Sequence, residues 1–398
     1  MNQEETTGLV LLGVGGGGCR LASAVRAAYG EGICALGVDT DALSNRDASD
    51  GGMPCLLLGG SRLSGHGTGG DVAVGRLAAQ DDLDNLQTHL HGARMVAVTA
   101  CLGGGTGGGA TPEVVKTLRD MGQGTLSICF VTKPFGFEGD ARVKSAERVL
   151  PQIEEHTDSM VVIPLDDLFV DAGKELLDDS IKAAEEIVAT GVTLLWRLLT
   201  KPGFIRLDAE RLYAMVFRGG NARLGFSVAE GAGRAERAVM ALKNCRLLRS
   251  GDALTKANAV MLGIHAGSDL RLSEVGEIMA TLRSLCKKDC IFEMGTVLDD
   301  RYDGRIELVA LAFESWSAGI PIDPPKDSAA PAAQESPAPE AFPIQPGSSR
   351  KKRPKAGGSK LSFGATGRGR FHNVETTIYK GQDLDVPTYI RREITLER

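Results

Sequence analysis

The sequence has no excess of positive charge, no long apolar run and no secretory pattern at its start. Its 398 residues include 45 Lys and Arg against 51 Asp and Glu, a formal net charge of −6. This balance disfavours a general nucleic-acid-binding protein, which needs a basic surface. No apolar run approaches the roughly 20 residues of a membrane-spanning helix, and the opening segment MNQEETTG lacks the basic and apolar regions of a signal peptide. We therefore expect a cytoplasmic protein without a nucleic-acid partner.

The sequence also lacks a disulfide framework and a metal-binding motif. Eight cysteines in a chain of this length fit reduced thiols better than a small cross-linked scaffold. Five of them lie in or beside apolar stretches and are expected in the core: Cys19, Cys34, Cys55, Cys101 and Cys129. Cys286 and Cys290 have a helical spacing, but no His or Cys pair accompanies them. The sequence therefore predicts no metal site.

The most informative feature that is present is the glycine-rich segment GGGTGGGA at 103–110, which follows an apolar stretch at 95–102. Glycine can adopt positive φ and lets the backbone approach a ligand closely. Consecutive amides in such a turn form a concave surface that binds phosphate, and a following helix adds its N-terminal partial charge. Thr106 can donate a hydroxyl, and Pro112 stands where a helix can begin. The segment predicts a phosphate-binding loop rather than a linker.

A second glycine loop, at 15–18, lies between a predicted buried strand and a predicted helix at 19–28. Residues 13–18 satisfy the dinucleotide pattern GxGxxG, and Asp39 ends the second predicted strand, where an NAD site has an acid. An NAD-linked oxidoreductase therefore stays open as an alternative. The loop at 103–110 argues against it, because a dinucleotide-binding fold does not need a second glycine loop. Neither loop is a Walker A motif, since no Gly-Lys-Ser/Thr follows.

The first half of the chain alternates between apolar strand patterns and helix patterns. Strands are predicted at 9–14, 33–38, 54–58, 94–101, 126–132 and 160–164, and helices include 73–79, 113–121 and 141–154. Apolar strands separated by helices indicate a parallel sheet covered on both faces. Ligands of such sheets bind at the carboxyl ends of the strands, which is where both glycine loops fall.

A long helix is predicted next, at about 174–200, because apolar residues recur there every three or four positions. The sequence Lys201-Pro202-Gly203 ends it. The following region predicts a smaller mixed α/β domain. Its strands are predicted at 211–217, 222–228, 259–266, 291–298 and 305–313, with helices near 234–244 and 272–285.

The chain is expected to be ordered only to about residue 317, because 321–349 is rich in Pro, Ala and Ser. A basic stretch follows at 350–355, which is either a solvated linker or a site of weak attraction to an anionic partner. At 383–392 the sequence DLDVPTYIRR predicts a short helix, with Asp385 as its cap and Pro387 at its start. Its apolar side chains favour a helix that binds in a partner's groove, with chance composition as the alternative.

These motifs together resemble FtsZ, the tubulin-like division protein family, over residues 8–313 and again at 383–392. GGGTGGGA looks like the tubulin/FtsZ signature. Six further segments each resemble an FtsZ segment in the family's order: GVGGGG at 13–18, DTDA at 39–42, VGRLAA at 74–79, VTKPFGFEG at 131–139, GSDLRL at 267–272 and LDVPTYIRR at 384–392. The implied organisation is a parallel-sheet GTP-binding domain at 1–172, a central helix at 173–202, a second α/β domain at 203–317, a disordered linker at 318–382 and an anchor-binding tail at 383–398.

The resemblance implies a GTP-dependent filament-forming GTPase of bacterial cell division, cytoplasmic and located at the division site. GTP or GDP would be bound, with Mg²⁺, and the chain would assemble with itself into a longitudinal homopolymer. The tail would bind a membrane anchor or a division regulator through Leu384, Val386, Pro387, Tyr389, Ile390 and Arg391. An alternative is a nucleotide-binding structural filament, an accessory relative with little or no GTP turnover.

The resemblance also implies the nucleotide site. The phosphate-binding residues would be Gly15, Gly16, Gly17, Gly103, Gly104, Gly105, Thr106 and Gly107, with Asp39 beside them. The loop of Gly67, Thr68 and Gly69 would sense the terminal phosphate, although its sequence departs from the usual one. Glu138 would bind the ribose and Arg142 would face the nucleotide. An i,i+4 ion pair on a helix is the alternative for these two.

Some positions depart from the family pattern. Ile181 occupies the place of an aromatic residue that stacks on guanine, and Leu165 that of an amide, while Glu186, with Glu185 beside it, still supplies a carboxylate for the base. In the catalytic loop, which acts on the neighbouring subunit's nucleotide, Asp208 matches the first aspartate.

Arginines occupy two other positions of the same loop. Arg206 replaces the asparagine of the family pattern, and Arg211 replaces its second aspartate. An arginine cannot accept a proton from water, although it can stabilise charge on a transferring phosphate. We expect Asp208 and Glu210 to share the positioning of water, and hydrolysis to be slow.

Overall fold

The protein is described by a computed structural model. The described ranges are 8–30, 32–122, 124–168, 177–200, 203–217 and 219–316, with the backbone of 378–379 and 382–383. The chain divides into two compact units at residue 330, and the second is represented by a short antiparallel pair of β11 (Ile378–Tyr379) and β12 (Gln382–Asp383). The predicted tail helix, and nearly all of the predicted linker, lie outside the described residues.

A ten-stranded sheet forms the centre of the first unit, in the order β3-β2-β1-β4-β5-β6-β7-β10-β8-β9. Its strands are β1 (Leu9–Val14), β2 (Ala35–Asp39), β3 (Cys55–Leu57), β4 (Met95–Cys101), β5 (Leu126–Lys133), β6 (Ser159–Pro164), β7 (Gly220–Glu230), β8 (Ala259–Ala266), β9 (Ile291–Leu298) and β10 (Arg305–Phe313). The strands from β3 to β7 in this order are parallel, whereas β10 is antiparallel to both β7 and β8. The predicted parallel sheet is confirmed.

The two halves of the sheet are joined where β6 meets β7. This ladder consists of three pairs, Ser159 with Gly220, Met160 with Asn221 and Val161 with Ala222. The sheet therefore continues from the predicted GTP-binding domain into the predicted second domain. The boundary between these domains stays a prediction.

Helices cover both faces of the sheet. They are α1 (Gly15–Tyr29), α2 (Ala42–Asp50), α3 (Gly60–Leu63), α4 (Val72–Asp81), α5 (Leu83–Leu90), α6 (Gly105–Asp120), α7 (Asp140–Glu154), α8 (Leu177–Thr200), α9 (Ala209–Val216), α10 (Arg234–Lys243), α11 (Asp252–Lys256) and α12 (Leu272–Leu285), with 3-10 turns η2 (Gly136–Glu138), η3 (Leu165–Leu168), η4 (Arg246–Leu248) and η5 (Asp300–Tyr302). Together with the strands they make the α/β fold that the sequence predicts.

Alternating residues of the strands separate the core into layers. On β5, Ile128 and Phe130 belong to one apolar cluster, which includes side chains of α1, α8 and α9. Cys129 and Val131 belong to a second cluster, with side chains of α4, α5, α6 and α7. A third cluster joins α10 and α12 to β8 and β10. Because successive side chains of a strand point to opposite faces and both faces are covered, the central strands are almost continuously apolar.

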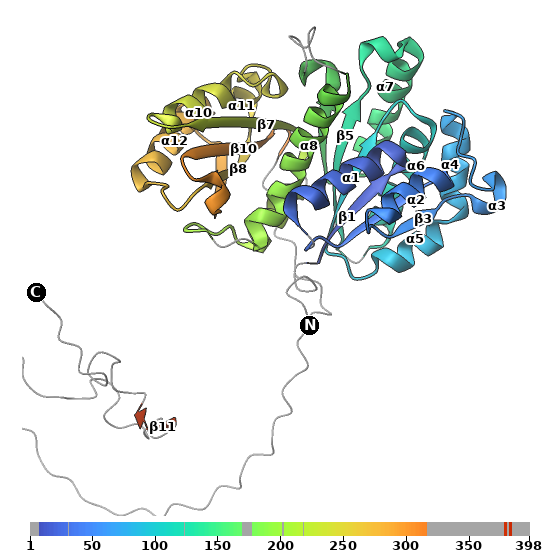
Figure 1. The fold of residues 1–398 in the computed structure, drawn as a ribbon, viewed down its shortest axis with the longest axis horizontal. Helices are drawn as coiled ribbons and strands as arrows, with labels where there is room; N and C mark the ends of the chain where they lie inside the picture. Colours follow the sequence, from blue (N-terminus) through green and yellow to red (C-terminus); the bar gives the residue numbers. More distant parts are fainter. Residues whose placement is uncertain are drawn as a thin grey trace, which may run out of the picture. The chain divides into compact units, whose positions relative to one another are not determined.

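Helix α8 lies between the two halves of the sheet, as Figure 1 shows. Its 24 described residues span about 36 Å at roughly 1.5 Å per residue. The predicted apolar face is confirmed, since Val188, Leu195 and Leu198 are buried. The predicted start, at 174, and the end at 201–202 lie outside the described residues.

The structure corrects one element of the sequence analysis. Residues 211–217 were expected to form a strand, but they lie largely within α9. The apolar stretch there does not distinguish a short strand from a buried helix. Asp208 decides the outcome as the N-cap, because its side chain accepts a hydrogen bond from the amide of Glu210.

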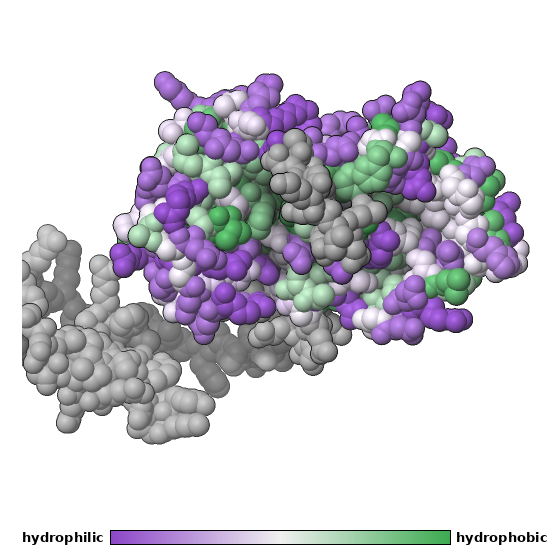
Figure 2. Space-filling model, turned by 45° about the horizontal axis from the view of Figure 1, so that its top comes forward, coloured by the Kyte–Doolittle hydropathy of each residue, from purple (hydrophilic) through white to green (hydrophobic). Residues whose placement is uncertain are grey.

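Hydrophilic residues cover much of the surface in the view of Figure 2, and hydrophobic residues gather mainly toward the middle of this face. Within the described ranges, we find no helix that combines the length and the apolarity needed to cross a bilayer.

Candidate functional site

A cavity of about 1040 Å³ opens at the carboxyl ends of β1 and β4. These two strands are neighbours, and the strand order reverses between them, since β2 and β3 lie on one side and β5 and β6 on the other. Crevices outside such a switch point are where open α/β sheets bind their ligands. The predicted site residues that line the cavity are Gly15, Gly16, Gly17, Asp39, Gly67, Thr68, Gly69, Gly104, Gly105, Thr106, Gly107, Glu138 and Arg142.

The glycines that follow the two strand tips adopt backbone conformations that favour glycine. Gly15, directly after β1, has a φ of 73°, and Gly103, after β4, has a φ of 98°. Each allows the chain to turn sharply from a strand tip into the next helix. Gly103 is not among the described residues that line the cavity, but it shapes the turn.

Most of the segment 103–110 is helical rather than an extended loop, because α6 begins at Gly105 and contains Pro112. The later glycines serve close packing. A β-carbon on Gly107 would lie 2.3 Å from the carbonyl oxygen of Cys101, and one on Gly109 would lie 2.2 Å from that of Val72. These glycines let α6 approach β4 and α4 closely.

The N-termini of α1 and α6 both border the cavity. In the described structure, neither the residue before α1 nor the residue before α6 supplies a capping side chain. The first amides of each helix therefore keep their donors available, and the helix dipoles add positive potential. Two uncapped helix starts facing one cavity provide the conditions for binding a phosphate chain.

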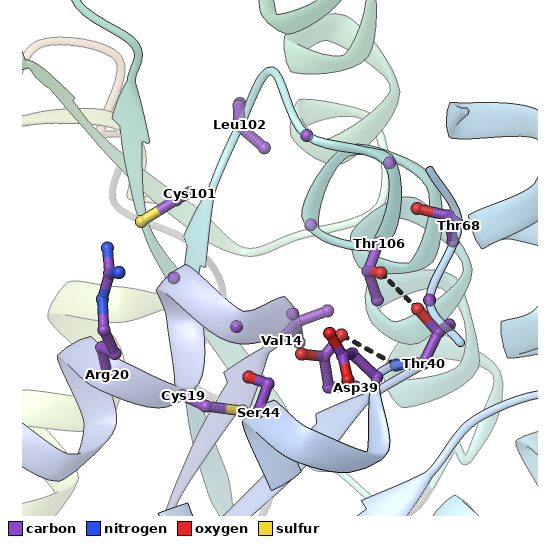
Figure 3. Close-up of a pocket in the computed structure, with 18 of the residues that line it drawn as sticks. Val14, Cys19, Arg20, Asp39, Thr40, Ser44, Thr68, Cys101, Leu102 and Thr106 are labelled. Carbon is purple, nitrogen blue, oxygen red and sulfur yellow. Dashed lines mark hydrogen bonds between the residues drawn. The ribbon is translucent and has the colours of Figure 1, made fainter. Parts of the chain in front are cut away.

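Polar side chains close one end of the cavity, as Figure 3 shows. The hydroxyl oxygens of Thr40 and Thr106 lie 2.7 Å apart, and the amide of Thr40 donates to Asp39 at 2.8 Å. Asp39 is only 3% exposed, and burial raises its pKa above the usual range, although hydrogen bonds to Ser44 and Thr40 oppose the shift. Thr68 meets the start of α6, since a β-carbon on Gly105 would lie 2.1 Å from its hydroxyl.

Glu138 and Arg142 form the ion pair that was the alternative to nucleotide contacts, and both also line the cavity. Arg142 donates to Glu138 at 2.7 Å, and Glu138 additionally accepts from the amide of Phe135 at 2.9 Å. Both alternatives drawn from the sequence are therefore geometrically compatible. A ligand bound beside Glu138 would contact a carboxylate that two hydrogen bonds hold in position.

The end of the cavity beside α8 is apolar, with Leu165 and Ile181 in its wall. Glu185 lines a small extension of this end and pairs with Arg20 at 3.3 Å. Figure 3 places Arg20 on α1, across the cavity from Asp39 and Thr40.

Glu186, the acid carried over from the family, is not among the described residues that line either hollow, and its carbonyl accepts from Thr190. Helical periodicity would have selected Glu185, because it stands four residues after Ile181 and shares its face. No sequence motif indicated a role for Arg20.

Asp208 and Glu210 lie far from the cavity of their own chain. Glu210 pairs at 2.9 Å with Arg94, which immediately precedes β4, whereas the cavity lies beyond the other end of that strand. Seven residues at roughly 3.3 Å each separate the two ends by about 20 Å. Arg211 is paired with Glu293 at 2.6 Å. Within one subunit, these acids cannot reach a bound phosphate.

Groups of three or more His, Cys, Asp or Glu side chains suited to a metal ion are absent from the described residues. Oxygen atoms that could coordinate a cation do line the cavity, including the hydroxyls of Thr40 and Thr106 and the carboxylate of Asp41. Such donors fit Mg²⁺ when phosphate oxygens supply most of its ligands.

Comparisons with known proteins agree with this architecture. The family model described as Tubulin/FtsZ family, GTPase domain, matches residues 8–172, and the FtsZ family, C-terminal domain, matches residues 220–314. Among known sequences, the cell division protein FtsZ of Wigglesworthia glossinidia brevipalpis is 32% identical over 303 residues, covering 76% of this chain and 78% of that protein.

Solved structures are similar in fold. An empty FtsZ dimer from M. jannaschii aligns with a TM-score of 0.70 and 28% identity over 76% of this chain and 87% of that chain. A GTPgS bound protofilament of CetZ2 from Haloferax volcanii aligns with a TM-score of 0.61 and 22% identity over 76% of this chain and 92% of that chain. At this level of identity, the match supports the fold alone.

The sheet order and the glycine turns at the switch point are thus those of tubulin-like proteins. The chain belongs to the FtsZ family, as the two matched domains and the extent of identity to FtsZ show. The resemblance predicted from the sequence motifs is confirmed. The model that matches the first 172 residues is that of a GTPase domain, not of an NAD-linked oxidoreductase.

Proposed function

We propose that the protein is a GTP-dependent, filament-forming GTPase of cell division whose active site is completed by the next copy of the chain. One observation carries this proposal. The phosphate-binding cavity lies at one end of β4 and the pair of Arg94 and Glu210 at the other. Only a second subunit, stacked end to end, can bring Asp208 and Glu210 to the nucleotide. An FtsZ relative described as a dimer is consistent with such stacking.

The nucleotide is bound by its phosphates first. Amides at the starts of α1 and α6 would bind the phosphate oxygens, and Thr106 would donate its hydroxyl. The loop of Gly67, Thr68 and Gly69 borders the start of α6 and would contact the terminal phosphate. Mg²⁺, when bound, would neutralise charge on the transferring phosphoryl group. Glu138 would accept hydrogen bonds from the ribose.

The base would occupy the apolar end beside α8. Aliphatic packing by Ile181 and Leu165 replaces ring stacking. Glu185, rather than Glu186, lines this end and can accept from the N–H groups of guanine, while Arg20 can donate to its carbonyl oxygen. This arrangement favours GTP and GDP over adenine nucleotides.

Hydrolysis would depend on carboxylates that already have partners in the free subunit. Asp208 caps α9, and Glu210 is paired with Arg94. To polarise water at the neighbouring phosphate, Glu210 must leave Arg94 or share it. The guanidinium of Arg211 is paired with Glu293. We therefore propose slow turnover.

The second candidate is a structural filament that binds nucleotide without appreciable turnover. The Arg94–Glu210 pair favours it, because a carboxylate held by a guanidinium is a poorer base. In both candidates the tail at 383–398, through Leu384, Val386, Pro387, Tyr389, Ile390 and Arg391, would bring the filament to a membrane anchor at the division site. These tail side chains lie outside the described residues.

A mixing experiment tests the shared active site. One variant, Asp208→Ala/Glu210→Ala, keeps the cavity but loses the carboxylates. The other, Gly104→Ala, keeps the carboxylates but places a methyl group in the cavity. Each variant alone should release little phosphate from GTP, and an equimolar mixture should recover part of the wild-type rate.

Sedimentation with GTP at increasing protein concentration measures assembly in parallel. If the mixture stays inactive while wild type hydrolyses GTP, the shared site is excluded. If wild type sediments with GTP but releases no phosphate, the structural filament is the correct function.

A further inference from the structure

A second cavity, of about 490 Å³, opens beside β6 and β7, apart from the nucleotide cavity. It shares no described residue with the first: at the end of β5, Thr132 lines the nucleotide cavity, whereas its neighbour Lys133 lines the second one. This volume lies within the range of small-molecule sites. The lining comes from the end of β5, from α7, β6, η3 and β7, and from the residues that follow η4 and β10: Lys133, Leu150, Glu154, Met160, Val162, Pro164, Asp167, Asn221, Ala222, Arg223, Arg249 and Glu314.

Two guanidinium groups in this cavity lack acceptors. Within the described part of the chain, the side chains of Arg223 and Arg249 form no ion pair and no hydrogen bond, although both line the cavity. Burial and the nearby charge of Arg249 lower the pKa of Arg223, and Glu314 and Asp167 only partly oppose this. A half-buried charge without a partner is costly. An anion placed between the two arginines would remove that cost with charge-assisted hydrogen bonds.

Two buried oxygens in the same cavity lack donors. Oδ1 of Asn221 and Oε1 of Glu314 are inaccessible and have no hydrogen-bond partner among the described residues. The other end of the Asn221 amide is fixed, since its nitrogen donates to Glu154 at 2.6 Å. The orientation of Asn221 is therefore set, and its oxygen is an unused acceptor. Apolar side chains, among them Met160 and Val162, complete the wall.

We propose that this second cavity binds a small organic anion that carries a hydroxyl or amino group next to its carboxylate or phosphate. The anionic group lies between Arg223 and Arg249. The neighbouring donor satisfies Glu314 and Asn221, and the carbon skeleton contacts the apolar wall. The site lies apart from the nucleotide cavity and does not depend on GTP.

Calorimetric titration of the full chain, saturated with GDP and free of Mg²⁺, tests the proposal. The probes are citrate, which has three carboxylates and a hydroxyl, tricarballylate, which has the carboxylates alone, and inorganic phosphate. We expect saturable citrate binding that GDP does not displace, and weaker binding of tricarballylate. Arg223→Gln and Arg249→Gln should each weaken citrate binding by about tenfold or more.

Arg246→Gln is the matched control, because this exposed residue of η4 lies three positions before Arg249 and does not line the cavity. It should bind citrate as wild type does. Circular dichroism and GDP affinity should be unchanged in all three variants, which shows that they fold.

The proposal is overturned if no probe gives saturable heat, if the two cavity variants bind citrate as well as the control, or if GDP abolishes the binding. A chain that fails to bind GDP contradicts the proposed GTPase alone. The comparison of the arginine variants, repeated without GDP, still decides on this site.

Discussion

Arg94 and Glu210, 116 positions apart in the sequence, form an ion pair at the amino end of β4. The guanidinium of Arg94 also lies 4.5 Å from the centre of the Tyr213 ring. Both charged side chains are well exposed, at 44% and 67%, so the pair contributes little stability. The ion pair can therefore separate at a subunit contact with little loss of stability.

Arg94→Gln should raise GTP turnover by a few-fold, because Glu210 no longer has its in-chain cation and can accept from water. Steady-state phosphate release from assembled protein measures this. Lys256→Gln, which breaks an exposed ion pair with Asp252, is the control and should have no effect. A fall in turnover equal to that of Glu210→Gln would mean instead that Arg94 positions Glu210 for catalysis.

Alanine substitutions at two glycines near the cavity should affect different properties, one the thermal stability and the other nucleotide binding. A β-carbon on Gly75 would lie 2.2 Å from the carbonyl oxygen of Gly105, whereas one on Gly104 would meet nothing within 4 Å. Gly75→Ala should lower the melting temperature by separating α4 from α6. Gly104→Ala should melt as wild type does and yet bind GTP more weakly, because its methyl group enters the cavity.

Thermal unfolding and a fluorescent-nucleotide titration distinguish these outcomes. Equal melting temperatures for both variants would contradict the close packing of α4 and α6.

Adjacent acids on α8 should differ in their effect on base selection. Glu185→Gln should weaken GTP binding by about tenfold, since a bidentate contact to a base is worth roughly 1–3 kcal/mol. It should also reduce the preference for GTP over ITP, which lacks the 2-amino group. Glu186→Gln, outside the cavity lining, is the matched control. Competition titrations measure both, and a larger effect at Glu186 would refute the assignment.

A buried charge cluster joins α8 to the second half of the sheet. Arg197 lies 3.8 Å from Glu307 and donates to Tyr302, and Glu307 accepts from His265. Arg305 also pairs with Glu307, at 3.5 Å. Arg197→Met should cost about 1–3 kcal/mol of unfolding free energy, because it removes one of the two guanidinium groups beside a buried carboxylate and leaves Tyr302 without its donor. Adding Glu307→Gln should restore part of this. Urea denaturation provides the measurement, and additive losses in the double variant would argue against the pairing.

Asp39 predicts a stability that depends on pH. Burial raises its pKa in the folded state above the ordinary 3.8. The protonated form therefore favours folding; this stabilisation is complete below pH 3.8 and is lost as the pH rises through the folded-state pKa. Asp39→Asn should melt higher than wild type at pH 7, and the difference should shrink toward pH 4. A constant difference across this range would assign the effect to hydrogen bonds alone.

Local patterns were sufficient to predict most of the sheet. The predicted strand at 9–14 matches β1, and that at 305–313 matches β10, because both are buried apolar stretches with clear ends. Residues 211–217 were mistaken for a strand because the same kind of stretch, when it is short, suits a helix equally well. The decisive signal was the cap at Asp208, three residues earlier.

The site was predictable in position but less so in mechanism. Glycine content located both turns at the β1–β4 switch point, yet it did not reveal that Gly107 and Gly109 are needed for helix packing. Such close approaches depend on residues distant in the sequence. The pairing of Arg94 with Glu210 has the same origin, and no spacing rule along the chain would have found it.

The seam between β6 and β7 also has a mechanical consequence. Three residue pairs join these strands, whereas nine join β7 to β10. Bending of a subunit should therefore concentrate at this narrow junction, and α8, which lies beside it, should limit the bending. The curvature of a filament of such subunits would arise as much from deformation within each subunit as from the contacts between subunits.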